Sequence, residues 1–382
     1  MKVCFVTGTR AEFDLLEGLI NELSTDQNFE IHVVVTGTHL SPEYGYTVRN
    51  IDHSLINNLH SIEMLMSGDS TSSITKSMGV ALIGFADLFK DLKPDLLFIL
   101  GDRYEILCSA ISAMIAGIPI CHHSGGELTE GLIDDPIRHS LTKMSHFHLV
   151  AAEKYKRRVV QMGEDPNNVF VVGGFGVDNI LTTKLWSPEK LSSDLNAKFR
   201  KKNFLITYHP VTLEKNTAEG QINNLLKALD SMEDTSLFFT QSNADPDGKL
   251  IDGKIRQFCA KNNNAYYFQT LGRQRYLSLM KICDAVLGNS SSGLTEAPSF
   301  KVPTVNIGDR QRGRLKANSV IDCASDTDAI YQALIKAVSK EFRSSIEFTT
   351  NPYGDGDAVL KTINVLNNLN LTDVLKKQFY DI

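Results

Sequence analysis

Three acidic side chains in the first half of the chain stand where they could carry out proton-transfer chemistry. Asp102 follows the apolar run 96–100, Glu127 follows the pair Gly125-Gly126, and Asp134 stands at the expected start of a helix. Acids at such places also act as ordinary helix caps. If the three lie at one edge of a parallel sheet, their crowding pushes their pKa values apart, as proton abstraction and return require.

Arginines provide local positive charge at two places. Arg10 comes just after the first apolar run, where a cation at a helix N-terminus can hold a phosphate; the alternative is an ordinary surface charge. The preceding Thr7-Gly8 lacks the glycines of a dinucleotide fingerprint and the lysine of a P-loop. Arg310, Arg312 and Arg314 lie within five positions, and the alternative for some of them is simple solvation.

The segment Gly288-Asn289-Ser290-Ser291-Ser292-Gly293 is the strongest local signal for an anion site. A strand ending in glycine, followed by three hydroxyls and a helix, offers backbone N–H and hydroxyl donors at a positive helix end. This pattern predicts a diphosphate cradle, with Glu296 one helical turn further on and able to bind a ribose diol. The alternative is a flexible Ser/Gly turn.

Histidines occur at two of the expected strand ends. His209 could act as an acid, a base or a phosphate donor, or it could be a capped ring facing solvent. The adjacent His122 and His123 suggest a metal at first sight, but neighbouring strand residues point to opposite faces and no third ligand stands at a metal spacing. We therefore predict no metal.

Alternating strands and helices are needed to position these residues. Short β-branched runs alternate with helical patterns, which predicts parallel sheets covered on both faces. The expected strands of the first domain are 3–7, 31–36, 96–100, 118–122, 148–151 and 169–173, and those of the second are 204–208, 236–240, 265–268, 285–288 and 304–307. The fold class is thus α/β, with two Rossmann-like doubly wound domains in tandem and the active site expected in the cleft between them.

The domain boundaries follow from the polar stretch 182–193, which is the expected linker. The first domain is predicted over residues 1–178 and the second over 179–356. The C-terminal segment, about 357–382, is expected to pack back on the first domain.

Composition excludes several classes of protein. The 382 residues are 42% hydrophobic and 22% charged, and 39 Lys and Arg against 45 Asp and Glu give a net charge of −6. Such a balance attracts neither nucleic acid nor an anionic membrane in bulk. The six cysteines show no CxxC spacing, and the sequence has neither a secretory leader nor an apolar span long enough for a membrane helix. We expect a cytoplasmic protein with reduced cysteines.

Taken in order, the motifs resemble those of the UDP-N-acetylglucosamine 2-epimerase family, specifically its hydrolysing branch in sialic-acid-type sugar synthesis. The six matching segments are GTRAEFD, LGDRYE, HHSGGE with IDDPIRHSLTKMSH, YHPVT, GNSSSGLTEAPSF with NIGDRQRGR, and YGDGDA. The resemblance implies a fold similar to the B-type glycosyltransferases, with UDP held mainly by the second domain. Ala11, where the non-hydrolysing branch has Pro, favours the hydrolysing branch.

The resemblance implies that UDP-N-acetylglucosamine and water give UDP and N-acetylmannosamine. UDP is eliminated in an anti sense to leave 2-acetamidoglucal, and hydration then inverts the second carbon. One alternative keeps this mechanism and changes the substrate to UDP-N,N′-diacetylbacillosamine, on the route to legionaminic acid. A further alternative is a B-type glycosyltransferase or a nucleotide-sugar binding protein.

The resemblance also implies roles for particular residues. The matching catalytic positions are Asp102, Glu127, Asp134, Arg138 and His209. The matching UDP-binding positions are Arg10, Asp14, Arg103, His209, Asn243, Leu271, Ser290, Ser291, Glu296 and Arg310. Asp14 stands where some relatives have Ser, and Leu15 stands where both branches often have Lys. No cofactor, metal, nucleic acid or membrane is expected, and the protein is expected to be a homodimer formed through the first domain.

Overall fold

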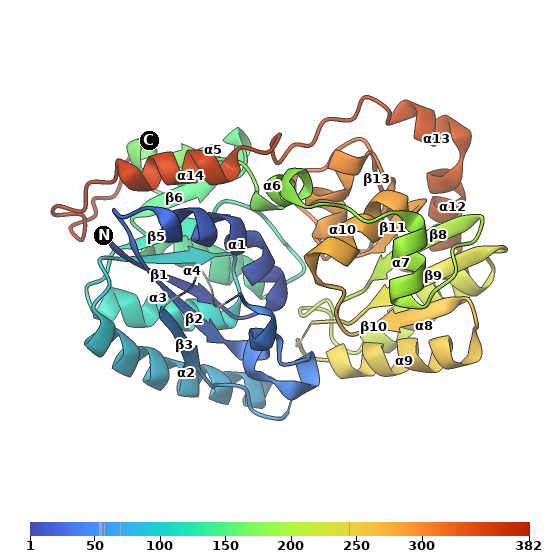
Figure 1. The fold of residues 1–382 in the computed structure, drawn as a ribbon, viewed down its shortest axis with the longest axis horizontal. Helices are drawn as coiled ribbons and strands as arrows, with labels where there is room; N and C mark the ends of the chain where they lie inside the picture. Colours follow the sequence, from blue (N-terminus) through green and yellow to red (C-terminus); the bar gives the residue numbers. More distant parts are fainter. Residues whose placement is uncertain (53–55, 57, 69, 244) are drawn as a thin grey trace. The chain divides into compact units, whose positions relative to one another are not determined.

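The computed structural model describes residues 1–52, 56, 58–68, 70–243 and 245–382, which form two compact units (Figure 1). The first unit comprises Met1–Glu127, Ile133–Asn179 and Tyr353–Ile382, and the second comprises Leu128–Leu132 and Ile180–Pro352. The short segment Leu128–Leu132 thus belongs to the second unit, although both its neighbours in sequence belong to the first.

The first unit contains a seven-stranded parallel sheet in the order β3-β2-β1-β4-β5-β6-β7. Its strands are β1 (Lys2–Thr7), β2 (Glu30–Thr36), β3 (Asn58–Ile62), β4 (Leu96–Leu100), β5 (Ile120–His123), β6 (Phe147–Val150) and β7 (Val169–Val171). Six of the seven were predicted, whereas the edge strand β3 was missed because four of its five residues are exposed or only half-buried and the strand reads as polar. The strand order reverses between β1 and β4, which is where open α/β sheets bind ligands.

Helices cover both faces of this sheet. The helices of the first unit are α1 (Arg10–Thr25), α2 (Thr71–Leu92), α3 (Tyr104–Ile115), α4 (Asp134–Met144), α5 (Glu153–Gln161) and α14 (Ala358–Asn367). Helix α6 (Phe175–Thr182) spans the boundary between the two units, which falls between residues 179 and 180. Alternate residues of β1 serve the two faces: Val3 and Phe5 pack with α1 and α14, while Cys4 and Val6 pack with α2 and α3. This alternation is the two-residue period of a strand that is buried on both faces.

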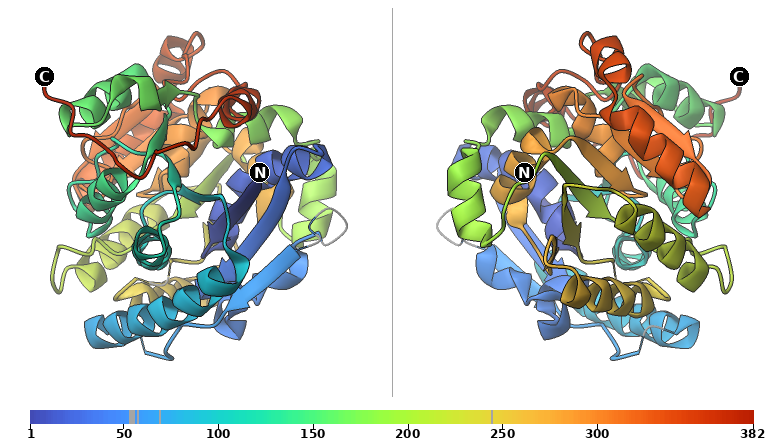
Figure 2. Two further views of the ribbon diagram at one scale, coloured as in Figure 1. Left: turned by 90° about the vertical axis from the view of Figure 1, so that its left-hand side faces the viewer. Right: turned by 90° about the vertical axis from the view of Figure 1, so that its right-hand side faces the viewer.

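The C-terminal tail, dark red in Figure 2, also lies on the first unit. Lys377 Nζ pairs with the buried carboxylate of Glu164 at 2.7 Å, and Tyr380 donates its N–H to the carbonyl of Gly163 at 2.9 Å. Glu164 also pairs with Lys143 at 2.6 Å and with His148 at 2.9 Å. Although burial raises the pKa of Glu164, these partners outweigh burial and bring the pKa down to about 2.

The second unit contains a six-stranded parallel sheet in the order β10-β9-β8-β11-β12-β13. Its strands are β8 (Lys202–Thr207), β9 (Thr235–Thr240), β10 (Ala265–Phe268), β11 (Ala285–Gly288), β12 (Thr304–Ile307) and β13 (Val320–Cys323). Its helices are α7 (Pro188–Leu195), α8 (Ala218–Asp230), α9 (Gly248–Lys261), α10 (Gly272–Ile282), α11 (Ser292–Thr295), α12 (Thr327–Val338) and α13 (Lys340–Ser345). Five strands were predicted, and the sixth, β13, was missed. The order reverses between β8 and β11, which gives this unit its own switch point.

Two apolar layers flank the second sheet. Phe204 and Ile206 pack with α8, α9 and α12 on one face, and Leu205 packs with α7 and α10 on the other. The stretch 182–193 is therefore not a plain linker: Ser187 caps α7 by accepting the N–H of Lys190, and Leu191 of that helix is buried in the core. Of the helices that the described residues form, none combines the length and apolar character needed to cross a bilayer.

Candidate active site

The turn after β1 places Arg10 at the first position of α1, as predicted. The Thr9 side chain accepts the N–H of Glu12, and the Glu12 side chain accepts the N–H of Thr9, so the helix starts with a capping box. Arg10 pairs with Asp14 one helical turn later at 2.7 Å. Asp14, predicted to bind UDP, therefore holds the neighbouring arginine in this structure.

Two buried carboxyl groups that the motif analysis did not single out lie beneath this turn. Glu12 accepts the N–H of Gly8 at 2.7 Å, and Glu105, from the first turn of α3, pairs with Arg103 at 2.9 Å. The side chain of Glu105 is 1% exposed and packs so closely against Gly8 that a Cβ on this glycine would overlap it. Burial, followed by the charge of Glu105, raises the pKa of Glu12 to about 8, so Glu12 is largely protonated at neutral pH.

The predicted catalytic residues of the first unit gather around Arg138, whose guanidinium is completely buried. It pairs with the carboxylate of Asp102, which follows β4, and donates to the backbone carbonyl of Glu127, which follows β5, at 3.1 Å. It also pairs with Asp135 at 3.1 Å. Asp134 begins α4 one turn before Arg138. Asp102 does not cap α3, because Arg103 occupies the N-cap position.

The backbone that leads to Glu127 is held by tight packing of the preceding Gly126 against α5. Gly126 has φ +76°, and a Cβ there would lie 2.5 Å from the carbonyl oxygen of Tyr155 on α5. Arg158, also on α5, donates to the Gly126 carbonyl. A side chain at residue 126 is therefore excluded on both conformational and steric grounds. The contribution of Arg158 was missed because it lies 32 positions along the chain from Gly126.

His122 and His123 are buried structural groups. His122 Nε2 bonds the carbonyl of Gly101, next to Asp102, at 2.7 Å, and His123 Nε2 bonds the carbonyl of Gly173 at 3.1 Å. Burial lowers their pKa values to about 3 and about 4, so both rings are neutral at physiological pH. In the part of the chain that the structure describes, no group of three or more His, Cys, Asp or Glu side chains is arranged to hold a metal ion.

In the second unit, the switch point brings three strand ends together at His209. Asn289, directly after β11, accepts the N–H of His209 at 2.7 Å and donates to its carbonyl at 2.8 Å. Asn243, after β9, donates its backbone N–H to His209 Nδ1 at 3.1 Å. Arg310, after β12, donates to the carbonyl of Asn289 at 3.1 Å. Thus His209, Asn243 and Arg310, all predicted from sequence, belong to one hydrogen-bonded network in which Asn289 links Arg310 to His209.

The serine loop differs in part from the expected cradle. Ser290 follows Asn289 directly, but the helix after it, α11, has only four residues, and Glu296 is its C-cap rather than a residue one turn inside a helix. Pro298 explains the early stop because it cannot continue the α-helical hydrogen-bond ladder. Ser291 is the N-cap of α11 but makes no side-chain capping bond. The dipole of so short a helix contributes little, which leaves side-chain and backbone donors to bind an anion.

Leu271, which was also predicted to bind UDP, lies immediately before α10. Its side chain is buried in the core beneath that helix, so only its backbone is available for polar contact. Tyr276 of α10 bonds Ser292 through its hydroxyl at 2.5 Å, and burial, followed by the charge of Glu296, raises the pKa of Tyr276. Glu296 and α10 are therefore neighbours.

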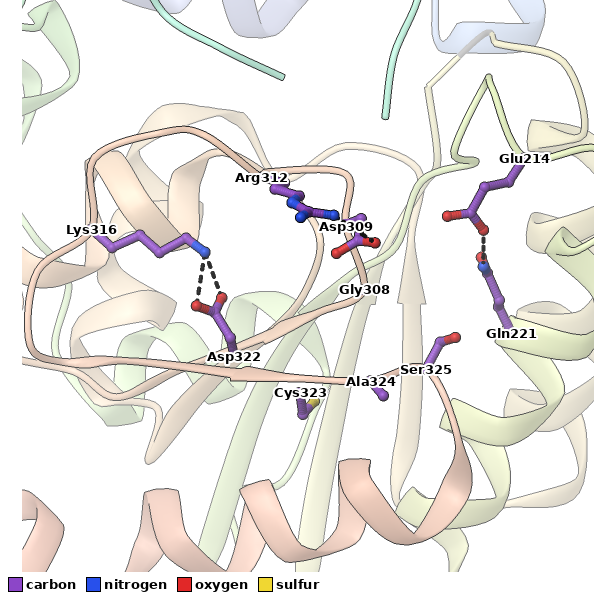
Figure 3. Close-up of a pocket in the computed structure, with 10 residues that line it drawn as sticks. All are labelled: Glu214, Gln221, Gly308, Asp309, Arg312, Lys316, Asp322, Cys323, Ala324 and Ser325. Carbon is purple, nitrogen blue, oxygen red and sulfur yellow. Dashed lines mark hydrogen bonds and ion pairs between the residues drawn. The ribbon is translucent and has the colours of Figure 1, made fainter. Parts of the chain in front are cut away.

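A polar cavity of about 550 Å³ lies beyond the ends of β12 and β13 (Figure 3). Figure 3 shows Lys316 paired with Asp322 on one side and Glu214 bonded to Gln221 on the other. The ten residues that line it are Glu214, Gln221, Gly308, Asp309, Arg312, Lys316, Asp322, Cys323, Ala324 and Ser325. None of the residues predicted from sequence to bind UDP or to act in catalysis is among them. Its lining carries both acids and bases, so its chemistry does not favour anions as a class.

The arrangement can perform two kinds of chemistry. One guanidinium binds the Asp102 carboxylate after β4 and the backbone of Glu127 after the adjacent strand β5, and acids at these strand ends can exchange protons with a bound molecule. Hydroxyl and backbone donors beside Arg310 and a histidine can stabilise a phosphate as it leaves.

Comparisons with known proteins agree with the motifs. The family model for UDP-N-acetylglucosamine 2-epimerase matches residues 21–367. The chain is 44% identical, over all of its length and 99% of the relative's, to the GDP/UDP-N,N′-diacetylbacillosamine 2-epimerase (hydrolyzing) of Campylobacter jejuni. It is 36% identical to the polysialic acid biosynthesis protein P7 of Escherichia coli, covering all of this chain and 97% of that protein.

Solved structures show the same architecture. The UDP-N-acetylglucosamine 2-epimerase of Neisseria meningitidis, solved with UDP-N-acetylglucosamine bound, superposes with a TM-score of 0.78 at 19% identity over 97% of this chain and all of that one. The fold is thus the tandem Rossmann-like type similar to B-type glycosyltransferases. The chain belongs to the UDP-N-acetylglucosamine 2-epimerase family and is an enzyme of its hydrolysing branch.

Proposed function

We propose that this enzyme cleaves a UDP-linked 2-acetamido sugar and releases the free sugar inverted at C2. The C2 proton passes to an enzyme base while the C1–O bond to the diphosphate breaks, leaving a C1=C2 double bond. Water then adds its oxygen to C1, and a proton is delivered to C2 on the face opposite to the one from which the first proton was removed. The sum is nucleotide sugar plus water giving UDP and the C2 epimer.

The carboxylates of the first unit supply the proton transfers in this proposal. Asp102, Glu127 and Asp134 act as a set, since elimination needs a base and hydration needs a donor and an activated water. We assign Arg138 a positioning role, because its guanidinium is fully buried and it binds Asp102, Asp135 and the Glu127 carbonyl. The gathering of Asp102 and Glu127 around Arg138 is the observation that carries the proposal.

UDP is held by local cations and donors, because the chain as a whole is acidic. Arg10 and Arg103 provide positive charge after β1 and β4, and Arg310 provides it after β12. Ser290 and Ser291 add hydroxyl and backbone donors. We propose that Asp14, Asn243, Leu271 and Glu296 complete the nucleotide site, with Asp14 acting through Arg10 and Leu271 through its backbone.

The sugar we favour is N,N′-diacetylbacillosamine, because the chain is 44% identical over its full length to a relative named for that sugar. UDP-N-acetylglucosamine, giving N-acetylmannosamine, is the second candidate, since it gives the matching family its name. The two sugars differ at the fourth and sixth carbons, so the choice concerns the binding of those groups and leaves the chemistry at C1 and C2 unchanged.

Incubation of the purified enzyme with each donor separates these possibilities. We expect UDP release to be faster from UDP-N,N′-diacetylbacillosamine, and a GDP-linked donor tests the choice of nucleotide. In D2O, the free sugar should carry deuterium at C2, because that proton comes from solvent. Transfer to an acceptor without a free sugar would instead indicate a glycosyltransferase and would overturn the proposal.

We also propose that the enzyme is a homodimer formed through the first unit. Ile83 on α2 and Ile115 on α3 are 69% and 80% exposed, and these two helices pack against each other. Apolar exposure of this kind is typical of an interface between subunits. Light scattering of the wild type and of an Ile83→Glu/Ile115→Glu variant tests it: the wild type should have twice the mass of the variant.

A further inference from the structure

We propose that Asn289 is a positioning residue for His209, and that the loop carrying Asn243 fixes the neutral imidazole in the tautomer that donates from Nε2. This inference rests on the proposed function, to which it adds that His209 donates to the departing diphosphate. It assigns to Asn289 a task that the serine-loop motif did not suggest.

The side chain of Asn289 holds the backbone of His209 at both of its polar groups. Oδ1 accepts the His209 N–H at 2.7 Å, and Nδ2 donates to the His209 carbonyl at 2.8 Å. Asn289 is completely buried, so water does not compete for either bond. Two bonds from one planar amide to one residue fix both the position and the orientation of that residue's backbone.

Asn289 is itself held firmly. Its N–H donates to the carbonyl of Thr207 on β8 at 3.2 Å, and its carbonyl accepts Arg310 Nη1 at 3.1 Å and Gln311 Nε2 at 2.8 Å. The preceding Gly288 has φ +120°, and a Cβ there would overlap the Thr207 carbonyl oxygen. This glycine lets the ends of β8 and β11 approach closely enough for the amide of Asn289 to reach His209.

The ring of His209 is oriented by a separate contact. The backbone N–H of Asn243 donates to Nδ1 at 3.1 Å, so Nδ1 is an acceptor and the neutral ring carries its proton on Nε2. A ring held in this way donates from Nε2, which suits the stabilisation of a leaving phosphate oxygen. Removal of a proton from the sugar by Nδ1 is disfavoured because that nitrogen is already engaged.

The variant Asn289→Ala removes the two side-chain bonds but keeps the backbone carbonyl that receives Arg310. We expect kcat to fall about 100-fold, because a displacement of about 1 Å in a catalytic group can cost that much, while KM and the UDP dissociation constant change less than about threefold. An unchanged kcat in a folded Asn289→Ala enzyme would overturn the proposal. So would a loss carried entirely by KM.

Asn203 provides a matched control on β8, the strand that leads to His209. Its side chain makes the same pair of bonds, accepting the N–H of Arg200 at 3.0 Å and donating to its carbonyl at 2.9 Å, but it lies at the start of β8. Asn203→Ala should lower the melting temperature, as Asn289→Ala does, yet leave kcat unchanged. If the two variants lost activity in parallel with stability, the role of Asn289 would be merely structural and the proposal would be wrong.

A measurement on the wild type tests the tautomer without changing Asn289. Two-dimensional ¹H–¹⁵N spectra that correlate ring protons with ring nitrogens report the tautomer of each histidine, and His209→Gln assigns the signal. We expect the Nε2–H tautomer at His209 both free and with UDP; an Nδ1–H tautomer would contradict the inference. If the wild type released no UDP from any donor, the proposed function would fail, whereas the spectrum would still decide the tautomer.

Discussion

Arg138 binds the carboxylate of Asp102 from a position 36 residues further along the chain, and its guanidinium is completely buried. The same guanidinium donates to the carbonyl of Glu127 at 3.1 Å, so one cation orients the segments that carry two predicted catalytic acids. A buried cation of this kind is stable only while its partners remain in place. The geometry of the predicted catalytic acids and the stability of the first unit are therefore linked.

Replacement of Arg138 by Met should destabilise the protein by about 3 kcal/mol or more, because it leaves partly buried carboxylates without their cation. Turnover should fall with it, since Asp102 loses its orientation. Urea unfolding and UDP release measure the two effects. The matched control is Arg343→Met, which breaks a more exposed pair with Asp284 at 2.6 Å and should cost less than about 1 kcal/mol. Equal costs for the two variants would contradict the central role of Arg138.

Asp102→Asn and Glu127→Gln should each lower kcat by at least about 100-fold, the usual contribution of a positioned acid or base. UDP binding measured by calorimetry should survive in both, because neither side chain is assigned to the nucleotide. Near-normal turnover in both variants would end the assignment of these acids. Asp87→Asn, an exposed acid on α2, controls for the loss of one negative charge.

Gly8→Ala should destabilise the first unit by about 1–3 kcal/mol, the typical cost of overpacking. The new Cβ would overlap the side chain of Glu105, which is buried and paired with Arg103. Adding Glu105→Ala should recover part of the loss by making room, and thermal unfolding of the single and double variants measures the coupling. Gly79→Ala is the control: this exposed glycine within α2 has nothing near its Cβ position, so the change should stabilise slightly.

Glu12 should make stability depend on pH. Its pKa is about 8 in the folded chain against an ordinary value of 4.5, so the folded state holds an extra proton between those values and the free energy of unfolding falls as pH rises through them. The variant Glu12→Gln keeps an acceptor for Gly8 N–H but removes this titration. Relative to the wild type, it should gain stability steadily from pH 5 to pH 8 in urea unfolding. A difference that stays constant over this range would show that Glu12 is ionised in the fold.

Much of the fold could be predicted because buried parallel strands are nearly continuous apolar runs. The bounds of β4, β10, β11 and β12 match the prediction exactly as residues 96–100, 265–268, 285–288 and 304–307. The missed strands β3 and β13 are edge strands at the ends of their sheets. An edge strand needs less apolar surface than a central one, so the patterns of β3 and β13 include polar residues, whereas the edge strand β10, Ala-Tyr-Tyr-Phe, is apolar and was predicted.

The candidate site could be predicted only in its sequence-local part. Placing Asp102, Asp134 and His209 at strand ends or helix starts needs only the local pattern, whereas their roles remain predictions. The hydrogen bonds between the Asn289 side chain and the His209 backbone join residues 80 positions apart, and the contact of Glu105 with Gly8 depends on β1 and β4 being neighbours. Strand order decides both contacts, and composition and periodicity do not specify strand order.

The return of the chain to the first unit at Tyr353, together with the excursion Leu128–Leu132, means that neither unit is one continuous piece of sequence. A fragment ending at residue 179 would lack α14, so Phe13 and Leu16 of α1 would lose an apolar neighbour. It would also carry the segment Leu128–Leu132 without Arg312, whose backbone carbonyl accepts the Glu130 N–H. A fragment of residues 180–352 would lack that same segment. The gene therefore cannot be divided at a single point into two folding modules, and a separately produced second unit would require a circular permutation or a grafted loop.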